Sequence, residues 1–452
     1  MAGNLSVTEL TNAVAAGDID TVIVGITDGQ GRLVGKRISA RFFLEEILGH
    51  GAEACNYLLA VDVDMNTVDG YAISSWETGY NDMVLMPDAS TLRRLPWQPG
   101  TALVIADVLQ GDRSPVAPSP RAMLNRQRER LAERGLVAYS GTELEFIVFD
   151  NTYRDAWRRR YHDLTPATDY NVDYNLTAST RMEPLLRDIR LGMDGAGLYS
   201  EGVKGECNLG QQEISFRFAE ALETADQHVI YKSGAKEIAE QHGQSLTFMA
   251  KFNEHEGNSC HIHLSVRSDS GEAVMAGDRE YGFSAFMEHW IAGILATLRE
   301  FTLLYAPNIN SYKRFTKGSF APTGVAWGID NRTCALRVVG RGGSLRVENR
   351  VPGGDVNPHL ATAAIIAGGL HGITNQLTMP QALRGNAYTA PGVDHLPTTL
   401  AEAERLFAES AVAKEAFGDD VVTHYLNQAR IEREAFEAAV TDWERVRGFE
   451  RL

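Results

Sequence analysis

The segment GTELEFIVFD, residues 141–150, places two carboxylates inside an otherwise apolar run. Side chains two positions apart on a β-strand share a face, so Glu143 and Glu145 point to one side while Leu144 and Phe146 point to the other. Two like charges that lie close together and away from water need a positive group between them. The segment therefore predicts a buried strand whose acidic face lies against a cation.

Three further segments show charged or metal-binding side chains in the alternating pattern of a strand: GECNLGQQEISFRF, GNSCHIHLSV and SLRVENR. Taken singly, each is more typical of an exposed sheet face, or of a core histidine with satisfied hydrogen bonds, than of a functional site. Their occurrence together favours a site. The residues concerned are Glu206, Glu213, His261, His263, Arg346, Glu348 and Arg350.

The combined set of five glutamates and a histidine is what hard divalent cations prefer. Mg²⁺ and Mn²⁺ bind carboxylate oxygens and accept one imidazole, whereas a structural zinc site would use closely spaced cysteines. No two cysteines of this chain form a CxxC pair; they are Cys55, Cys207, Cys260 and Cys334. We therefore expect Mg²⁺ or Mn²⁺ as the metal.

Several arginines follow the acidic residues along the chain. Guanidinium groups hold anionic oxygens through paired hydrogen bonds. Divalent metals combined with arginines are typical of phosphoryl transfer. The arginines are Arg314, Arg332, Arg337, Arg346 and Arg350.

Composition and proline placement indicate the elements that must position these residues. The 452 residues include 59 acidic and 43 basic side chains, a formal net charge of -16, which argues against a nucleic-acid partner. The proline-rich segment QGDRSPVAPSP, residues 110–120, predicts a domain boundary. Ser119 and Pro120 suit the start of a following helix. We expect an α+β fold with a small domain over residues 1–114 and a larger one over 115–452.

The cysteines and the apolar segments bear on location. The chain starts without the basic region of a secretion signal, and Ser6 with Glu9 suits a capping box on a first helix. The longest apolar segment, ATAAIIAGGL at 361–370, is shorter than the ~20 residues that a bilayer span needs. Scattered cysteines fit a reducing compartment. We therefore expect a cytoplasmic protein without a membrane partner.

Seven segments, taken in order, resemble the glutamine synthetase family over nearly the whole chain. They are DGYAISSW, DMVLMPDAST, ELEF, ECNLGQQE, NSCHIHLS, NRTCALRV and LRVENR. The resemblance implies an N-terminal β-grasp domain and a C-terminal catalytic domain with a curved antiparallel sheet. It also implies a homododecamer of two hexameric rings, with each active site shared between neighbouring subunits.

Carried over position by position, the resemblance implies two metal ions and ATP. The positions that match the ligands of the first metal are Glu145, Glu206 and Glu213. Those that match the ligands of the second are Glu143, His261 and Glu348.

The remaining matched positions concern ATP and glutamate. His263 and Ser265 match the nucleotide side, and the phosphate-binding positions are Arg332, Arg337 and Arg346. Arg314 and Arg350 match the pair that holds the glutamate carboxylate. The reaction implied is phosphorylation of the γ-carboxylate of glutamate by ATP, followed by displacement of phosphate by an amine.

The departures from the family pattern concern the amine. Where typical members carry a glutamate in the loop after YKR, this chain has Phe320, which cannot act as a base and offers an apolar surface. Glu256 stands where an asparagine is typical, with Gly257 retained. Asp69 matches an acid of the neighbouring subunit that helps to deprotonate the nucleophile. Tyr71 belongs to an altered loop beside it, and we expect Tyr71 to help shape the pocket for the amine.

These departures resemble the branch that joins glutamate to organic amines, namely polyamines, ethanolamine or alkylamines. One alternative is an ordinary glutamine synthetase that uses ammonium. Another is a non-catalytic regulator that binds glutamate or a nucleotide, although all six metal positions are retained. Tyr388, in GNAYTAPG, lies near a position that is modified in some bacterial members, but its flanking residues differ, so we interpret it as an ordinary loop tyrosine.

Overall fold

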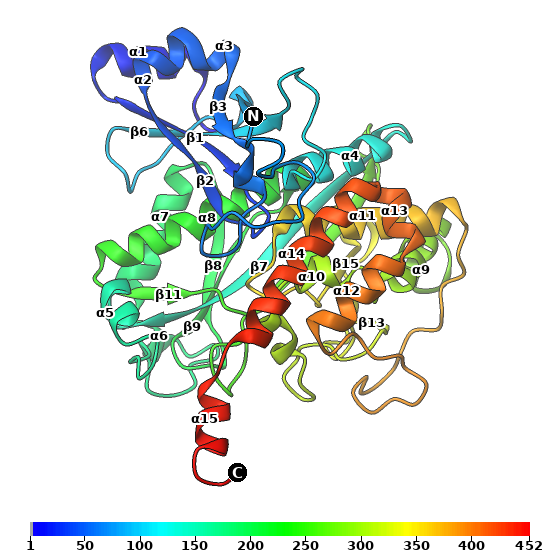
Figure 1. Cartoon of the computed structure of the whole chain (residues 1–452). Helices are drawn as coiled ribbons and strands as arrows, with labels where there is room; N and C mark the ends of the chain where they lie inside the picture. The colour runs from blue at the N-terminus through cyan, green and yellow to red at the C-terminus, as the bar shows by residue number, and fades with distance from the viewer. Residues whose placement is uncertain (1–2) are drawn as a thin grey trace.

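The structure is a computed structural model that describes residues 3–452 and contains two β-sheets flanked by helices. Figure 1 shows the N-terminal sheet, in blue, beside a larger sheet covered by helices. The first helix, α1 (Val7–Ala16), starts with the predicted capping box: Glu9 N–H donates to Ser6 Oγ, and Ser6 N–H donates to the Glu9 carboxylate. Gly17 ends the helix in the left-handed conformation that glycine adopts without strain.

The N-terminal sheet has the order β2-β1-β6-β4-β3, with β5 also paired to β6. Its two central strands, β1 and β6, are parallel, and the other pairs are antiparallel. Helix α1 and the helical run α2 (Ala40–Phe42) to α3 (Leu48–His50) join a common apolar core with the sheet. The strands are β1 (Thr21–Thr27), β2 (Leu33–Ser39), β3 (Ala52–Cys55), β4 (Asp82–Pro87), β5 (Arg93–Arg94) and β6 (Thr101–Leu109).

The large sheet has the order β13-β14-β15-β12-β7-β9-β8, with β10 and β11 also paired to β7. All pairs are antiparallel except β13 with β14. The strands are β7 (Leu136–Phe149), β8 (Ser200–Gly205), β9 (Gln211–Phe216), β10 (Ala219–Glu220), β11 (Ser245–Thr247), β12 (Cys260–Ser268), β13 (Trp327–Ile329), β14 (Leu336–Val339) and β15 (Arg346–Asn349).

The long strand β7 separates a helix-covered face from a polar face, as its alternating sequence predicts. Leu144 and Phe146 lie fully in the main hydrophobic core, together with Ile214 of β9 and Ile262 of β12. Glu143 and Glu145 alternate with these residues and therefore project from the opposite face. The sheet thus presents one side to the helices and leaves the other for chemistry.

Helices pack against the apolar side of the large sheet and against one another. Gly293 and Gly368 allow α9 and α11 to approach closely, since a Cβ at Gly293 would lie 2.1 Å from the Gly368 carbonyl oxygen. The apolar segment 361–370, which is too short to span a bilayer, lies within the buried helix α11. The main helices of this part are α4 (Pro120–Ala132), α7 (Glu183–Gly195), α8 (Ala221–Gln241), α9 (Ala285–Thr297) and α11 (Pro358–Thr374).

A buried arginine at the start of α4 links the N-terminal sheet to helix α8. Arg121 is 3% exposed and forms ion pairs with Asp226 of α8, at 3.1 Å, with Asp88, which follows β4, at 2.7 Å, and with Asp107 of β6. The predicted boundary at residue 114 lies in the irregular connection 110–119 and stays a prediction. Ser119 precedes the helix as predicted, but its hydroxyl makes no capping hydrogen bond.

The C-terminal helices run back across both parts of the molecule. Helix α14 (Asp419–Ala438) packs against α12 (Leu400–Glu409), and its Asn427 donates to the Asp69 carbonyl at 3.0 Å. Helix α15 (Asp442–Gly448) then extends away from the body of the molecule, in red in Figure 1. Among the helices of the described residues, none is long and apolar enough to cross a membrane.

Candidate active site

Strand register brings the predicted polar residues into adjacent rows on one face of the large sheet. Opposed residues on paired strands share a face. His261 on β12 lies opposite Glu143 on β7, and Glu145 lies opposite Glu213 on β9. A neighbouring row runs across three strands through Arg337, Glu348 and His263.

One acidic cluster is built around Glu143 and Glu348. Its potential ligand atoms, from Glu143, His263 and Glu348, lie within 4.8 Å of one another. His261 also reaches this cluster, with Nδ1 3.2 Å from Glu143 Oε2 and 3.4 Å from Glu348 Oε1. The structure therefore gathers all three residues predicted for the second metal and adds His263 to them.

Glu348 is fully buried and is surrounded by cations. Arg337 Nη1 lies 2.8 Å from one carboxylate oxygen, and Arg350 pairs with the other. Burial alone would raise the pKa of Glu348, but His261 and Arg350 hold it below its usual range. Burial and the charge of Arg350 lower the pKa of His261, which favours the neutral ring that binds metals.

A second acidic cluster consists of Glu145, Glu206 and Glu213, whose carboxylate oxygens lie within 4.8 Å of one another. Glu145 Oε2 accepts hydrogen bonds from Ser259 N–H at 2.7 Å and from Gln211 Nε2 at 3.2 Å. Glu206 comes from the loop directly after β8, so a loop residue completes a set that starts on strands. These are the three residues predicted for the first metal.

The chemistry of this cluster fits a hard divalent cation. Burial and the negative charge of Glu143 raise the pKa of Glu213 to about 7, the sign of carboxylates held together against their repulsion. The donors are oxygens, which Mg²⁺ and Mn²⁺ prefer. The arrangement thus favours a cation between the carboxylates.

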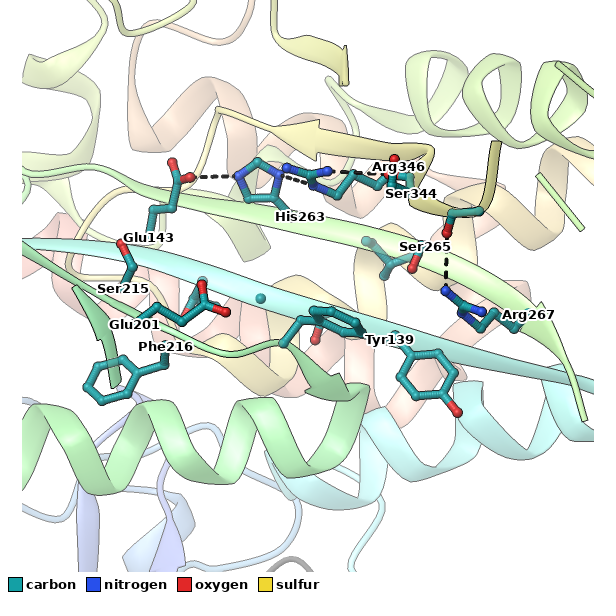
Figure 2. Close-up of a pocket in the computed structure, with 16 residues that line it drawn as sticks. Tyr139, Glu143, Glu201, Ser215, Phe216, His263, Ser265, Arg267, Ser344 and Arg346 are labelled. Carbon is teal, nitrogen blue, oxygen red and sulfur yellow. Dashed lines mark hydrogen bonds and ion pairs between the residues drawn. The ribbon is translucent and has the colours of Figure 1, made fainter. Parts of the chain in front are cut away.

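A cavity of about 450 Å³ opens beside the Glu143 cluster. Figure 2 shows its wall, where Arg346 Nε donates to His263 Nδ1 at 3.2 Å and His263 Nε2 lies 3.0 Å from Glu143 Oε1. Ser265 lines the same cavity, as do the aromatic rings of Tyr139 and Phe218. The residues predicted for the nucleotide side therefore lie together around one space with room for a planar base.

A separate cavity of about 360 Å³ is also lined by Glu143. Arg314 and Arg350, the predicted glutamate-binding pair, are each 3% exposed and line it together with Arg332 and Arg337. Arg314 Nη2 donates to main-chain carbonyls, including that of Pro352 at 2.6 Å. Burial lowers the pKa of Arg314 to about 10, which still leaves the guanidinium charged at neutral pH.

The residues predicted for the amine border this second cavity. Phe320, Glu256 and Gly257 all line it, and Phe320 is 56% exposed. Gly257 admits no side chain, because a Cβ there would lie 2.2 Å from the Ala250 carbonyl oxygen. The same Cβ would lie 2.9 Å from Arg314 Cγ, so glycine at this position leaves room for the Arg314 side chain.

Two predicted residues lie away from both cavities. Asp69 is exposed on the loop between β3 and β4 and lines neither cavity of its own chain. Its role in the site of a neighbouring subunit stays a prediction. Tyr71 is 4% exposed, and its ring packs against His424 of α14 at 4.6 Å between centroids. This burial speaks against the predicted role of Tyr71 in an amine pocket, because its ring faces the core.

The structure adds residues that sequence reasoning missed. Lys204 pairs with Glu206, lies 3.8 Å from Glu213, and its ammonium is 5.0 Å from the centre of the Tyr174 ring. Asp173 and Cys207 approach Glu206 within the same 4.8 Å limit. Lys204 and Cys207 lie close to Glu206 in the sequence, so their proximity to the site could have been predicted. No motif indicated Asp173.

Comparison with known proteins gives the same assignment along the whole chain. The model of the glutamine synthetase catalytic domain matches residues 117–447. A γ-glutamylethanolamide synthetase, GlnA4 of Streptomyces coelicolor, is 62% identical over 99% of this chain and 96% of its own length. A glutamate–isopropylamine ligase of a Pseudomonas species is 35% identical over 95% of each chain.

The fold agrees with solved structures of related proteins. A complex of GmaS with ADP superposes with a TM-score of 0.86 and 28% identity, covering 98% of this chain and all of the other. The α+β fold expected from the sequence, with its curved antiparallel sheet, is thereby confirmed. The chain is a carbon–nitrogen ligase that belongs to the glutamine synthetase family.

Proposed function

We propose that this enzyme uses ATP to join the γ-carboxylate of glutamate to ethanolamine, or to another small organic amine. The observation that carries the choice of amine is Phe320, an aromatic ring at the wall of the glutamate-side cavity. The 62% identical γ-glutamylethanolamide synthetase supports ethanolamine as the first candidate.

The two cavities suit the two halves of a phosphoryl transfer. ATP would bind beside His263, Ser265 and Arg346, and glutamate would bind beside Arg314 and Arg350. Glu143 lines both cavities, so the γ-phosphate and the γ-carboxylate would meet next to it. Holding both reactants in one geometry removes much of the entropic cost of their encounter.

Metal ions would be held by the two acidic clusters. We propose two or more Mg²⁺ or Mn²⁺ ions per site, the first at Glu145, Glu206 and Glu213 and the second at Glu143, His261 and Glu348. Such ions supply Lewis acidity toward phosphoryl oxygens when bound. The protein's own contribution is to fix the carboxylates, which it does through Ser259, Gln211 and Arg337.

The first chemical step forms γ-glutamyl phosphate. A γ-carboxylate oxygen attacks the γ-phosphorus of ATP, the bond to the β-phosphate oxygen breaks, and ADP leaves. Arg337 and Arg332, which line the glutamate-side cavity, would balance the charge that develops on the transferred group. Arg346 would hold the nucleotide phosphates from the other cavity.

The second step forms the amide. The amine nitrogen attacks the carbonyl carbon of γ-glutamyl phosphate, the bond from that carbon to the phosphate oxygen breaks, and the nitrogen loses a proton to a base. We propose that Asp69 of a neighbouring copy is that base, which requires an assembly in which two subunits share the site. We propose that this assembly is a homododecamer of two hexameric rings. Phe320 would pack against the carbon chain of the amine, each buried CH₂ contributing about 0.8 kcal/mol.

Polyamines and alkylamines are alternatives within the same reaction, and ammonium would make the enzyme an ordinary glutamine synthetase. The complete ligand set and the two cavities favour catalysis over a regulator that only binds glutamate or a nucleotide. We also propose a cytoplasmic location, because the four cysteines are free thiols and the reaction consumes ATP.

The test measures phosphate release from ATP with glutamate and Mg²⁺ against a panel of amines. The panel comprises ethanolamine, isopropylamine, methylamine, putrescine, spermidine and ammonium, with each product identified by its mass. A γ-glutamyl ethanolamide with little glutamine is the expected result. Efficient glutamine formation would restore the ammonium alternative, and no turnover with any amine would favour the regulator.

A further inference from the structure

The loop that carries Phe320 holds this residue in an unusual backbone conformation. Its φ of 58° is left-handed, which is rare for a bulky aromatic residue. Such conformations persist where the surrounding structure holds them, and they concentrate at functional sites. Because Phe320 also borders the glutamate-side cavity, the groups that hold it bear on which amine can bind.

Two side chains hold the carbonyl groups around this strained position. Arg350 Nη2 donates to the Phe320 carbonyl at 3.3 Å, and the Tyr388 hydroxyl donates to the Ala321 carbonyl at 3.0 Å. Arg350 is already engaged with Glu348 in the site. Tyr388 lies 67 residues beyond Ala321 and has no role in the site described above. The function of the hydrogen bond from its hydroxyl to the loop is therefore still to be explained.

Tyr388 belongs to a segment that is itself anchored. The N–H of Ala387 donates to Thr333 Oγ1 at 2.9 Å, and Asn331 Nδ2 donates to the Gly385 carbonyl at 2.8 Å. These hydrogen bonds hold the segment from which the Tyr388 side chain reaches the loop.

The two segments also pair directly beyond these anchors. Val325 N–H donates to the Asp394 carbonyl at 2.8 Å, and Leu396 N–H donates to the Thr323 carbonyl at 3.0 Å. The segment after Phe320 and the segment after Tyr388 are thus joined by hydrogen bonds. Among these hydrogen bonds, the one from the Tyr388 hydroxyl to the Ala321 carbonyl lies at the cavity wall.

We propose that Tyr388 is a positioning residue for amine selection, which fixes the Phe320 ring over the cavity through the Ala321 carbonyl. The assignment rests on the proposed function and replaces the interpretation of Tyr388 as an ordinary loop tyrosine. When the hydroxyl is absent, the loop relaxes and Phe320 no longer packs on the carbon chain of the amine.

The kinetic test is Tyr388→Phe, which removes the hydroxyl and keeps the ring. The KM for ethanolamine rises about fivefold, as expected for one lost hydrogen bond, while the KM values for glutamate and ATP and the Tm stay unchanged. Tyr161→Phe, at an exposed tyrosine, is the matched control. Equal increases in all three KM values, or a lowered Tm alone, would overturn the proposal.

A double-mutant cycle tests whether Tyr388 acts through Phe320. In a Phe320→Ala background, Tyr388→Phe has no further effect on the KM for ethanolamine, because the ring that it positions is gone. An additive increase contradicts the proposal.

A readout without substrate separates this inference from the proposed function. Lys317 is exposed on the same loop, so Tyr388→Phe accelerates trypsin cleavage after Lys317 relative to wild type and to Tyr161→Phe. Unchanged cleavage overturns the anchoring role even if ethanolamine is the substrate. Faster cleavage in a protein that ligates only ammonium overturns the proposed function and retains the anchor.

Discussion

Glu143 Oε1 lies 3.0 Å from His263 Nε2, and Glu143 borders both the nucleotide-side and the glutamate-side cavities. Because His263 Nδ1 accepts from Arg346, the ring proton lies on Nε2 and is donated to Glu143. A short hydrogen-bonded chain thus links an arginine of one cavity to the carboxylate at the boundary of the two.

Removing the hydrogen bonds that join Arg346, His263 and Glu143 should reduce the rate of phosphoryl transfer and have a smaller effect on folding stability. His263→Ala removes the contacts to Arg346 and Glu143, and we expect kcat to fall about 100-fold because charge stabilisation is lost at the transferred phosphoryl group. Single-turnover formation of ADP with glutamate and ATP measures the effect. His50→Ala, at an exposed histidine of the N-terminal part, should leave the rate unchanged. A His263→Ala enzyme with wild-type turnover would show that these hydrogen bonds have only a structural role.

The carboxylates of the first cluster should determine metal affinity. Glu213→Gln removes one charge from the Glu145, Glu206 and Glu213 set, and we expect the affinity for Mn²⁺ to fall at least about tenfold. Titration followed by electron paramagnetic resonance measures bound Mn²⁺ without turnover. Glu240→Gln, on the exposed face of α8, is the control. Equal affinities in the two variants would exclude the cluster as a metal site.

The residue at position 320 should set the preference between organic amines and ammonium. Phe320→Glu places a carboxylate at the cavity wall, so it should raise kcat/KM for ammonium and lower it for ethanolamine, each by about tenfold or more. Phe320→Leu keeps an apolar side chain and should retain the preference for ethanolamine. If both variants keep the wild-type ratio, the selection of the amine lies elsewhere in the pocket.

The buried ion pairs around Arg121 should make stability fall in acid. Burial acts to raise the pKa of Asp226, but Arg121 and His359 outweigh it, so the pKa lies below its ordinary value in the folded protein. The unfolded state then binds more protons in acid. The stabilisation is therefore complete above the unfolded value near pH ~4 and is lost as the pH falls through the lower, folded pKa.

Asp226→Asn isolates this contribution. Removing one partner of a buried pair should cost about 3–5 kcal/mol at neutral pH. The difference in unfolding free energy between wild type and variant should shrink as the pH falls below about 4. Urea unfolding across this range measures it, with Asp442→Asn as an exposed control. A difference that does not change with pH would contradict the assignment.

Local patterns sufficed for much of the fold and for the inventory of the site. The alternation in ELEF predicted the two faces of β7, and Ser6 with Glu9 predicted the capping box of α1, since both depend on residues adjacent in sequence. The family motifs predicted the ligand sets because a chemistry that needs carboxylates and arginines constrains residue types at each position.

Long-range contacts were beyond such patterns. The pairing of Lys204 with Glu206, the burial of Tyr71 against His424 and the contact of Tyr388 with Ala321 each depend on where distant segments pack. Tyr71 and Tyr388 illustrate the limit, because both are loop tyrosines in the sequence. Packing directs the Tyr71 ring toward the core and brings the Tyr388 hydroxyl to the loop of Phe320. Residue types dictated the available chemistry, whereas the packing of remote segments determined which side chains reach the cavities.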